Sequence, residues 1–267
     1  MRRRGSRPAV RTVVPVTSRV LETPSTVTLR FPFAPSAAPG QFVMLWVPGD
    51  DELPMSLSYT DGPSKGVTVK AMGATSRRVL GIRAGDRVGV RGPYGDAFDL
   101  TARHILAVAG GSGAAVLAPA AEAARASGAA VTAALGATTA AELLFERRFR
   151  AMGAEVVLAT DDGSGGERGF VTGPAERQLA SGRFDALWTC GPEVMMVKLV
   201  RAARAHGVPA FCSVERHMKC ALGMCDACAL GPFHVCTDGP VLEGTALLER
   251  TEFGRFHRDP SGRRILA

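Results

Sequence analysis

Four of the six cysteines lie within a short stretch near the C-terminal end, and their spacing constrains this chain more than any other feature. They are Cys220, Cys225, Cys228 and Cys236. The spacing C-x4-C-x2-C-x7-C begins like that of plant-type [2Fe–2S] proteins, in which four thiolates hold two irons. Gly223 lets the loop turn with a positive φ and approach a cluster, so that neighbouring N–H groups can bond to its sulfurs. Residues 213–243 are too short and polar to bury much apolar surface, so a bound cluster is expected to organise them.

A structural zinc ion is the main alternative use of these cysteines. Zinc sites usually pair their cysteines in two short C-x2-C units, and here only Cys225 and Cys228 form such a pair. A disulfide framework would spread cysteines through a small secreted chain, whereas none precedes Cys190 here. The pattern therefore favours a [2Fe–2S] cluster with Cys190 and Cys212 outside it.

Composition narrows the function classes. The 267 residues, 46% of them hydrophobic, are enough for two domains, and no apolar run reaches the ~18 residues of a membrane span. The net charge of +7 would be compatible with a nucleic-acid-binding protein. However, aromatic residues make up only 6% and do not interleave with the basic ones, as they do in proteins that bind single strands. Met1–Arg4 is basic without an apolar stretch behind it, unlike a secretory signal. We expect a cytoplasmic protein that binds neither membrane nor nucleic acid.

Residues 10–100 show the pattern of an all-β domain. Short runs rich in Val, Thr, Leu and Phe alternate with Pro and Gly clusters, which indicates a closed barrel or a sandwich. The expected strands are Val10–Val20, Thr26–Phe31, Gln41–Val47, Met55–Thr60, Gly66–Ala71 and Asp86–Arg91. A short helix is expected at Thr75–Leu80.

The period of the pattern changes near Leu100–His104. Strand-like and helix-like segments then alternate, which predicts a parallel sheet covered on both faces over residues 101–212. The expected strands are Ile105–Ala109, Ala130–Leu135, Glu155–Ala159 and Ala186–Thr189, and the expected helices Ala114–Ser127, Thr139–Phe149 and Pro192–Ala205. The cysteine segment at 213–243 and a mixed, Arg-rich tail at 244–267 follow.

Several turns have the composition of phosphate-binding turns. Gly110-Gly111-Ser112-Gly113 follows one parallel strand and opens a helix, where a pyrophosphate can rest. Cys190-Gly191 ends another such strand. Each turn has a structural alternative: a tight strand–helix connection for the glycines, and a small buried hydrophobe for Cys190. The same ambiguity applies to Ser56 in a barrel strand and to Gly73-Ala74-Thr75, which opens the expected helix.

Taken together, these motifs resemble the electron-transfer subunits of NAD-dependent dihydroorotate dehydrogenase, within the ferredoxin reductase superfamily. The resemblance extends from about Val10 to Val241. The segments that carry it are Pro39–Pro48, Pro54–Ser58, Gly85–Asp86, Gly92–Gly95, Glu215–Cys220 and Cys236–Val241. The chain departs from the family at Leu53, where an Arg is common, at Ala115-Val116, where Ala-Pro is usual, and in the short spacing of its last two cluster cysteines.

The resemblance implies FAD in the barrel, NAD(H) in the second domain and the [2Fe–2S] cluster beside the flavin. It also implies a partner subunit that contains FMN and oxidises dihydroorotate to orotate, a step of pyrimidine biosynthesis. The implied cofactor contacts are Ser56 at the flavin ring, Gly73, Ala74 and Thr75 at its diphosphate, Gly110, Gly111 and Gly113 at the dinucleotide phosphates, and Asp161, Asp162, Cys190 and Gly191 at the nicotinamide side. Asp161 and Asp162 could equally be solvated loop residues.

The order of these parts has a chemical logic. A nicotinamide transfers two electrons as hydride and a [2Fe–2S] cluster accepts one, so a flavin must stand between them. Because Leu135–Thr139, where an adenosine ribose would lie, contains no Arg, we expect NADH to be preferred over NADPH. Two rivals remain: a gamma-type NAD(P)H-oxidoreductase subunit of a hydrogenase, sulfur reductase or sulfite reductase, and a non-enzymatic zinc-binding module.

Overall fold

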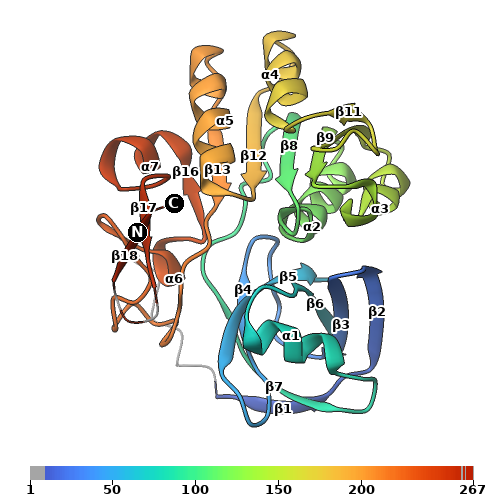
Figure 1. The fold of residues 1–267 in the computed structure, drawn as a ribbon, viewed down its shortest axis with the longest axis vertical. Helices are drawn as coiled ribbons and strands as arrows, with labels where there is room; N and C mark the ends of the chain where they lie inside the picture. The colour runs from blue at the N-terminus through green and yellow to red at the C-terminus, as the bar shows by residue number, and fades with distance from the viewer. Residues whose placement is uncertain (1–9, 260, 262, 267) are drawn as a thin grey trace.

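Two seven-stranded sheets, one antiparallel and one mostly parallel, form the body of the molecule (Figure 1). The computed structural model describes residues 10–259, 261 and 263–266, so the basic Met1–Arg4 segment lies outside it. Within the described part of the chain, every helix is too short or too polar to span a bilayer.

The first sheet is the predicted β domain. Its order is β1-β7-β4-β5-β6-β3-β2, and all of its pairs are antiparallel. The elements are β1 (Thr12–Pro15), β2 (Ser18–Thr23), β3 (Thr26–Pro32), β4 (Phe42–Trp46), β5 (Glu52–Tyr59), β6 (Ser64–Lys70), α1 (Ala74–Gly81) and β7 (Arg87–Tyr94). Leu29, Leu45 and Leu57 fill its interior. The sheet curls, because its two edge strands, β1 and β2, are consecutive in the chain.

The expected single strand Val10–Val20 is two strands in the structure. At Val16 the backbone N–H bonds to Asp86 beside β7, and at Thr17 it bonds to Arg30 on β3. The chain therefore changes partner between these two residues. This change is the bend that brings the two edges of the curled sheet together.

The second sheet has the order β11-β10-β9-β8-β12-β13-β16, parallel except for β16. Its elements are β8 (His104–Gly110), α2 (Gly113–Ala126), β9 (Ala130–Ala137), η1 (Ala140–Glu142), α3 (Glu146–Ala151), β10 (Glu155–Thr160), β11 (Glu167–Arg168), α4 (Thr172–Ala180), β12 (Ala186–Cys190), α5 (Glu193–Ala205), β13 (Ala210–Ser213) and β16 (Val241–Glu243). Ile105 and Ala107 of β8 pack with α2, whereas Leu106 and Val108 pack with α4 and α5. Burial on both faces explains the uninterrupted apolar run.

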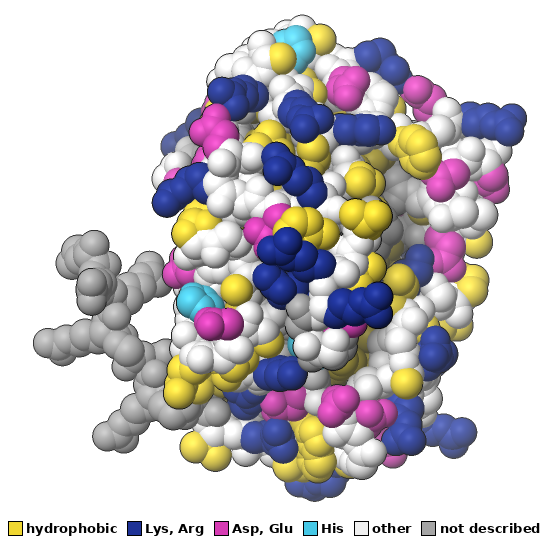
Figure 2. Space-filling view, turned by 60° about the vertical axis from the view of Figure 1, so that its left-hand side comes forward, with side chains coloured by type: hydrophobic (Ala, Val, Ile, Leu, Met, Phe, Trp, Pro, Cys, Tyr) yellow, Lys and Arg dark blue, Asp and Glu magenta, His cyan; other side chains and the backbone are white. Residues whose placement is uncertain are grey.

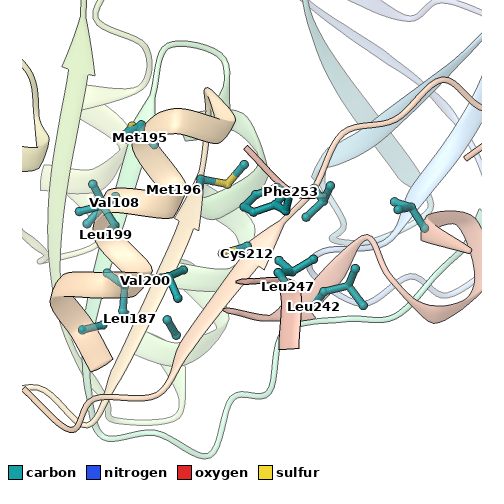
Figure 3. Packing of buried hydrophobic residues seen from close by; sticks show 14 of the residues in the cluster. Val108, Leu187, Met195, Met196, Leu199, Val200, Cys212, Leu242, Leu247 and Phe253 are labelled. Carbon is teal, nitrogen blue, oxygen red and sulfur yellow. The ribbon is translucent and has the colours of Figure 1, made fainter. Parts of the chain in front are cut away.

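One expected helix needs correction, and the tail contains a helix that was not expected. The helix predicted at Thr139–Phe149 is broken into η1 and α3, because Phe145 adopts a left-handed conformation (φ 62°) and buries its ring in the core. The tail after residue 243 contains α7 (Gly244–Arg250), whose Leu247 packs with Val200 and Phe253 in the core that Figure 3 shows. The apolar residues Ala246, Leu247 and Leu248 within the Arg-rich tail are the sequence signal that could have predicted α7.

The cysteine segment lies between the two sheets. It contains β14 (Ala229–Leu230), β15 (Phe233–His234) and α6 (Val235–Asp238), and it returns to the parallel sheet as β16; a last hairpin, β17 (Phe256–Arg258) and β18 (Arg264–Leu266), follows. Its apolar residues join a core that also holds barrel residues. The shared members are Phe42, Met44 and Tyr94 of the barrel with Met218, Ala221, Cys228, Leu230, Val235 and Cys236 of the segment.

Candidate functional site

The loop from Cys220 to Cys228 brings the predicted cluster ligands together in two pairs. The thiols of Cys220 and Cys225 are within hydrogen-bonding reach of each other, and so are those of Cys228 and Cys236. The N–H of Leu222 donates to the Cys220 sulfur (3.3 Å), and the N–H of Gly223 donates to the Cys236 sulfur (3.3 Å). Gly223 has the expected positive φ of 70°.

Two further loop residues have a positive φ that their side chains did not signal. They are Ala221 (φ 59°) and Asp226 (φ 55°). Left-handed conformations cost energy for residues with a Cβ and persist only where the surroundings impose them, often at ligand-binding sites. The contacts around the loop, rather than the local preference of Ala221, therefore fix its backbone.

The donor set suits a two-iron cluster. Among the described residues, no group of three or more His, Cys, Asp or Glu side chains is arranged to hold a metal ion. The four thiols lie in two pairs, and two thiolates per iron are what a two-iron cluster requires. The hydrogen bond between Cys228 and Cys236 lowers the pKa of Cys228 to about 6 and raises the pKa of Cys236, so one thiol of this pair ionises well before the other. Burial raises the pKa of Cys220, but the N–H groups of Leu222 and Met224 outweigh it and lower the pKa to about 7. Thiolates are the form that binds iron.

The other two cysteines lie outside the loop and stay protonated. Cys190 ends β12 and Cys212 lies in β13, fully buried. Burial is the main cause that raises the pKa of Cys190 to about 12, and burial also raises the pKa of Cys212. Neither thiol is therefore a competing ligand at neutral pH.

The predicted flavin contacts lie on β5 and at the start of α1. Ser56 pairs with Phe42 across β4 and β5 and is half-buried. At the helix start, the Ser76 hydroxyl accepts the N–H groups of Met72 (2.9 Å) and Gly73 (2.8 Å). The next two N–H groups, of Ala74 and Thr75, lie in the first helical turn, where no helical carbonyl can accept them.

This helix start can hold a diphosphate through its backbone. A Cβ on Gly73 would meet nothing within 4 Å, so the turn faces open space. The Thr75 hydroxyl is bonded to Asp50 (2.9 Å), which leaves its N–H rather than its side chain to meet a phosphate. Leu53 faces Leu45 of β4 and offers no charge. Backbone N–H groups and the helix dipole are thus the means by which this chain can bind the anion.

The glycine turns after β8 and β12 pack directly on each other. A Cβ on Gly113 would lie 2.0 Å from the Cys190 carbonyl oxygen, and one on Gly191 would lie 2.9 Å from the Gly110 nitrogen. A Cβ on Gly111 (φ 53°) would meet nothing within 4 Å. Gly110, Gly113 and Gly191 therefore serve the tight connection between strand and helix, because a side chain there would clash. Gly111 instead leaves room for a ligand over the start of α2.

The structure does not bring Asp161 and Asp162 together with Cys190 and Gly191. The two aspartates follow β10, which lies three strands from β12 in the sheet, or about 14 Å. Their N–H groups bond to Ala137 and Thr138, the segment expected at the adenosine ribose. The Asp162 carboxylate accepts from the side chain and backbone of Ser164, which lowers its pKa. Chain order alone could not show how far apart the ends of β10 and β12 lie in the sheet.

Polar bridges between the two sheets were missed by sequence reasoning. Arg148 of α3 donates to the Ser58 carbonyl (2.8 Å), with its guanidinium 3.9 Å from the Tyr59 ring centroid. Glu142 of η1 accepts from Ser25 (2.8 Å) and pairs with Lys70 (2.9 Å) on the barrel. These bonds join the antiparallel and the parallel sheet in one relative orientation. No local pattern marks them, because each joins residues more than 70 positions apart.

Comparison with known proteins shows which family shares the cysteine segment and the rest of the chain. Residues 215–248 match the model of the iron–sulfur cluster binding domain of dihydroorotate dehydrogenase B. A protein of Thermoplasma volcanium, named "probable dihydroorotate dehydrogenase B (NAD(+)), electron transfer subunit", is 40% identical over 250 residues, which cover 94% of this chain and 96% of that protein. A protein of the same name from Methanothermobacter thermautotrophicus is 43% identical over 249 residues, covering 91% and 92%. The chain belongs to the family of dihydroorotate dehydrogenase B electron transfer subunits.

Solved structures place this electron transfer subunit among flavin-dependent reductases. The structure of an NADH-dependent reduced ferredoxin–NADP oxidoreductase, studied for flavin-based electron bifurcation, matches with a TM-score of 0.78 at 27% identity, covering 93% of this chain and 94% of that one. A cytochrome P450 reductase from Amycolatopsis matches with a TM-score of 0.65 at 26% identity, covering 76% and 68%. The predicted family and fold class are confirmed; the individual flavin, nucleotide and cluster contacts and the domain bounds stay predictions.

Proposed function

We propose that this chain moves electrons between NAD(H), FAD and a [2Fe–2S] cluster, coupled to oxidation of dihydroorotate to orotate on a partner subunit that contains FMN. In this proposal residues 10–100 hold FAD, 101–212 hold NAD(H), 213–243 hold the cluster and 244–267 form the tail. The observation that carries it is the core shared by Phe42, Met44 and Tyr94 with the cluster segment, because Phe42 lies opposite Ser56 at the predicted flavin site.

The bound groups supply the redox chemistry, in which a flavin converts two-electron hydride transfer into single-electron steps. The protein's own residues bind and orient. The N–H groups of Ala74 and Thr75 hold a diphosphate, the turn at Gly111 admits the dinucleotide, and Cys220, Cys225, Cys228 and Cys236 hold the irons. The hydrogen bonds of Arg148 and Glu142 keep the two cofactor domains in a fixed relative orientation.

The family name, electron transfer subunit, means that the chain works with a catalytic partner. We propose that the partner docks over the cluster loop, where Met224 is 78% exposed and Leu222 is 37% exposed. Figure 2, in which the left-hand side of Figure 1 comes forward, shows apolar side chains intermixed with basic and acidic ones on this side of the molecule. Phe233 of β15, in the same segment, is half-buried, with the Arg250 guanidinium 5.6 Å from its ring centroid, so Met224 is the stronger anchor. All six cysteines are unpaired, as suits the reducing cytoplasm in which we place the protein.

Co-expression with an FMN-containing dihydroorotate dehydrogenase subunit tests this proposal. We expect the two chains to co-elute on size-exclusion chromatography and the complex to form NADH from dihydroorotate. Met224→Asp should weaken co-elution, whereas Leu21→Asp, a change of the same kind at an apolar side chain that is 57% exposed on β2, outside the cluster loop, should not. Separate elution with no NAD-linked activity would favour a gamma-type subunit of another reductase. A colourless purified protein would favour the zinc-binding module.

A further inference from the structure

Arg91 joins the flavin barrel to the cluster loop. It lies on β7, and its side chain is only 14% exposed. One Nη donates to the Cys220 carbonyl (2.9 Å), and the other donates to the Lys219 carbonyl (3.0 Å). These two carbonyls belong to the first predicted iron ligand and to the residue before it. A single barrel side chain therefore binds the backbone where the cluster loop begins.

Every N–H donor of this guanidinium is used. Its Nε and one Nη bind the Glu52 carboxylate (3.0 and 2.8 Å), and the remaining Nη donor binds the Tyr94 hydroxyl (3.1 Å). A guanidinium has five N–H groups in a rigid plane, and five are engaged. Glu52 sits on β5 and Tyr94 on β7, so the barrel holds Arg91 from two strands.

The contacts continue to the predicted flavin contact. The Tyr94 ring packs on Phe42, with 5.7 Å between centroids, and Phe42 pairs with Ser56 on β5. An unbroken series of contacts thus runs from Ser56 through Phe42, Tyr94 and Arg91 to Cys220. Tyr94 and Phe42 are both buried, so this series has little freedom to shift.

We propose that Arg91 is a positioning residue that sets the distance and orientation of the cluster relative to the flavin, and thereby the rate at which electrons pass between them. The proposal rests on the proposed function, since it requires both groups to be bound. Arg91 need not touch either one. Its fixed positive charge, which binds the carbonyls beside Cys220, also favours the reduced and more negative cluster.

Arg11 offers a matched control. It donates to the same Glu52 carboxylate (2.8 and 3.0 Å) and carries the same charge. Its side chain is 42% exposed, and its described contacts are with Glu52 and the Trp46 ring rather than with the cluster loop. A change that acts only through Glu52 or through net charge will therefore appear in Arg11→Gln as well as in Arg91→Gln.

The experiment uses the full chain with both groups bound, without a partner, mixed with NADH under anaerobic conditions. Stopped-flow absorption separates flavin reduction from cluster reduction, and redox titration with electron paramagnetic resonance gives the cluster potential. In Arg91→Gln we expect flavin reduction within about twofold of wild type and cluster reduction slowed roughly tenfold or more, with a lower potential and an altered spectrum. Arg91→Lys should be intermediate, because one ammonium cannot bind Glu52 and both carbonyls. Arg11→Gln should match wild type.

Each outcome of this experiment supports or overturns the positioning role of Arg91. Wild-type cluster reduction, potential and spectrum in Arg91→Gln would overturn the proposal, and so would an equal change in Arg11→Gln. Loss of iron from Arg91→Gln with FAD retained would support it, provided that Arg11→Gln keeps its iron. If Arg91→Gln loses both groups, Arg91→Lys decides, and wild-type behaviour there would overturn the proposal. A wild-type chain without flavin or iron would instead refute the proposed function.

Discussion

The ion pair between Glu193 and Arg216 gives a sharp test of how the cluster segment is attached to the nucleotide domain. Glu193 lies in the first turn of α5, just after Cys190-Gly191, and Arg216 lies four residues before the first cluster cysteine. Their side chains are 15% and 5% exposed. The other Glu193 oxygen accepts the Gly254 N–H (2.7 Å), and Arg216 also donates to the Glu215 carbonyl (2.8 Å).

Replacing Glu193 with Ala would remove the ion-pair partner of a buried guanidinium, for which only the electrostatic attraction of Glu215 would remain. One of its terminal nitrogens already has no hydrogen-bond partner among the described residues, so the group cannot easily find another acceptor. Breaking a buried pair from one side costs about 3–5 kcal/mol. For a chain of this size, that corresponds to a fall in melting temperature of roughly 6–20 °C.

The exposed pair of Arg204 and Glu249 is the control. Its N–O distance is 2.7 Å, but its side chains are 60% and 53% exposed, so Glu249→Ala should cost at most about 1 kcal/mol. Differential scanning calorimetry on the cofactor-bound chain compares the two variants. Replacing both Glu193 and Arg216 by Leu and Met should restore most of the loss, because no buried charge remains. Equal small shifts for Glu193→Ala and Glu249→Ala would refute the reasoning.

Four other predictions follow from the site. Cys225→Ser should abolish the paramagnetic signal of the reduced cluster; a full, unshifted signal would exclude Cys225 as a ligand. Gly113→Ala should cost more than about 1 kcal/mol and weaken NADH binding in calorimetry, because its Cβ would lie 2.0 Å from the Cys190 oxygen; wild-type affinity would contradict this. NADH should exceed NADPH in diaphorase kcat/KM, and equal values would refute the preference. Burial opposes ionisation of Glu142, but Lys70 and Ser25 lower its pKa below 4.5. The stability that ionised Glu142 contributes is therefore complete above pH 4.5 and is lost as pH falls through the lowered pKa. Lys70→Gln should raise the pH midpoint of acid unfolding, and an unchanged midpoint would argue against the bridge.

The sequence by itself determined the features that depend on local pattern. The spacing of the cysteines predicted a four-thiolate loop, and the structure brings those thiols together in two pairs. The apolar run at Ile105–Ala109 predicted a strand covered on both faces, and its alternate residues do lie in two different cores. Such features survive because a ligand spacing or a two-residue period is complete within a few positions of the chain.

Only the tertiary structure decided how the parts are joined. Arg91 reaches Cys220 across 129 positions and Arg148 reaches Ser58 across 90, and an arginine in an Arg-rich chain carries no mark of its partner. The distance of Asp161 from Cys190 follows from strand order in the sheet, which is not chain order. The left-handed φ of Ala221 is imposed by the loop around it rather than by its own preference. Long-range contacts are set by which surfaces bury together, and that choice is made by the whole chain.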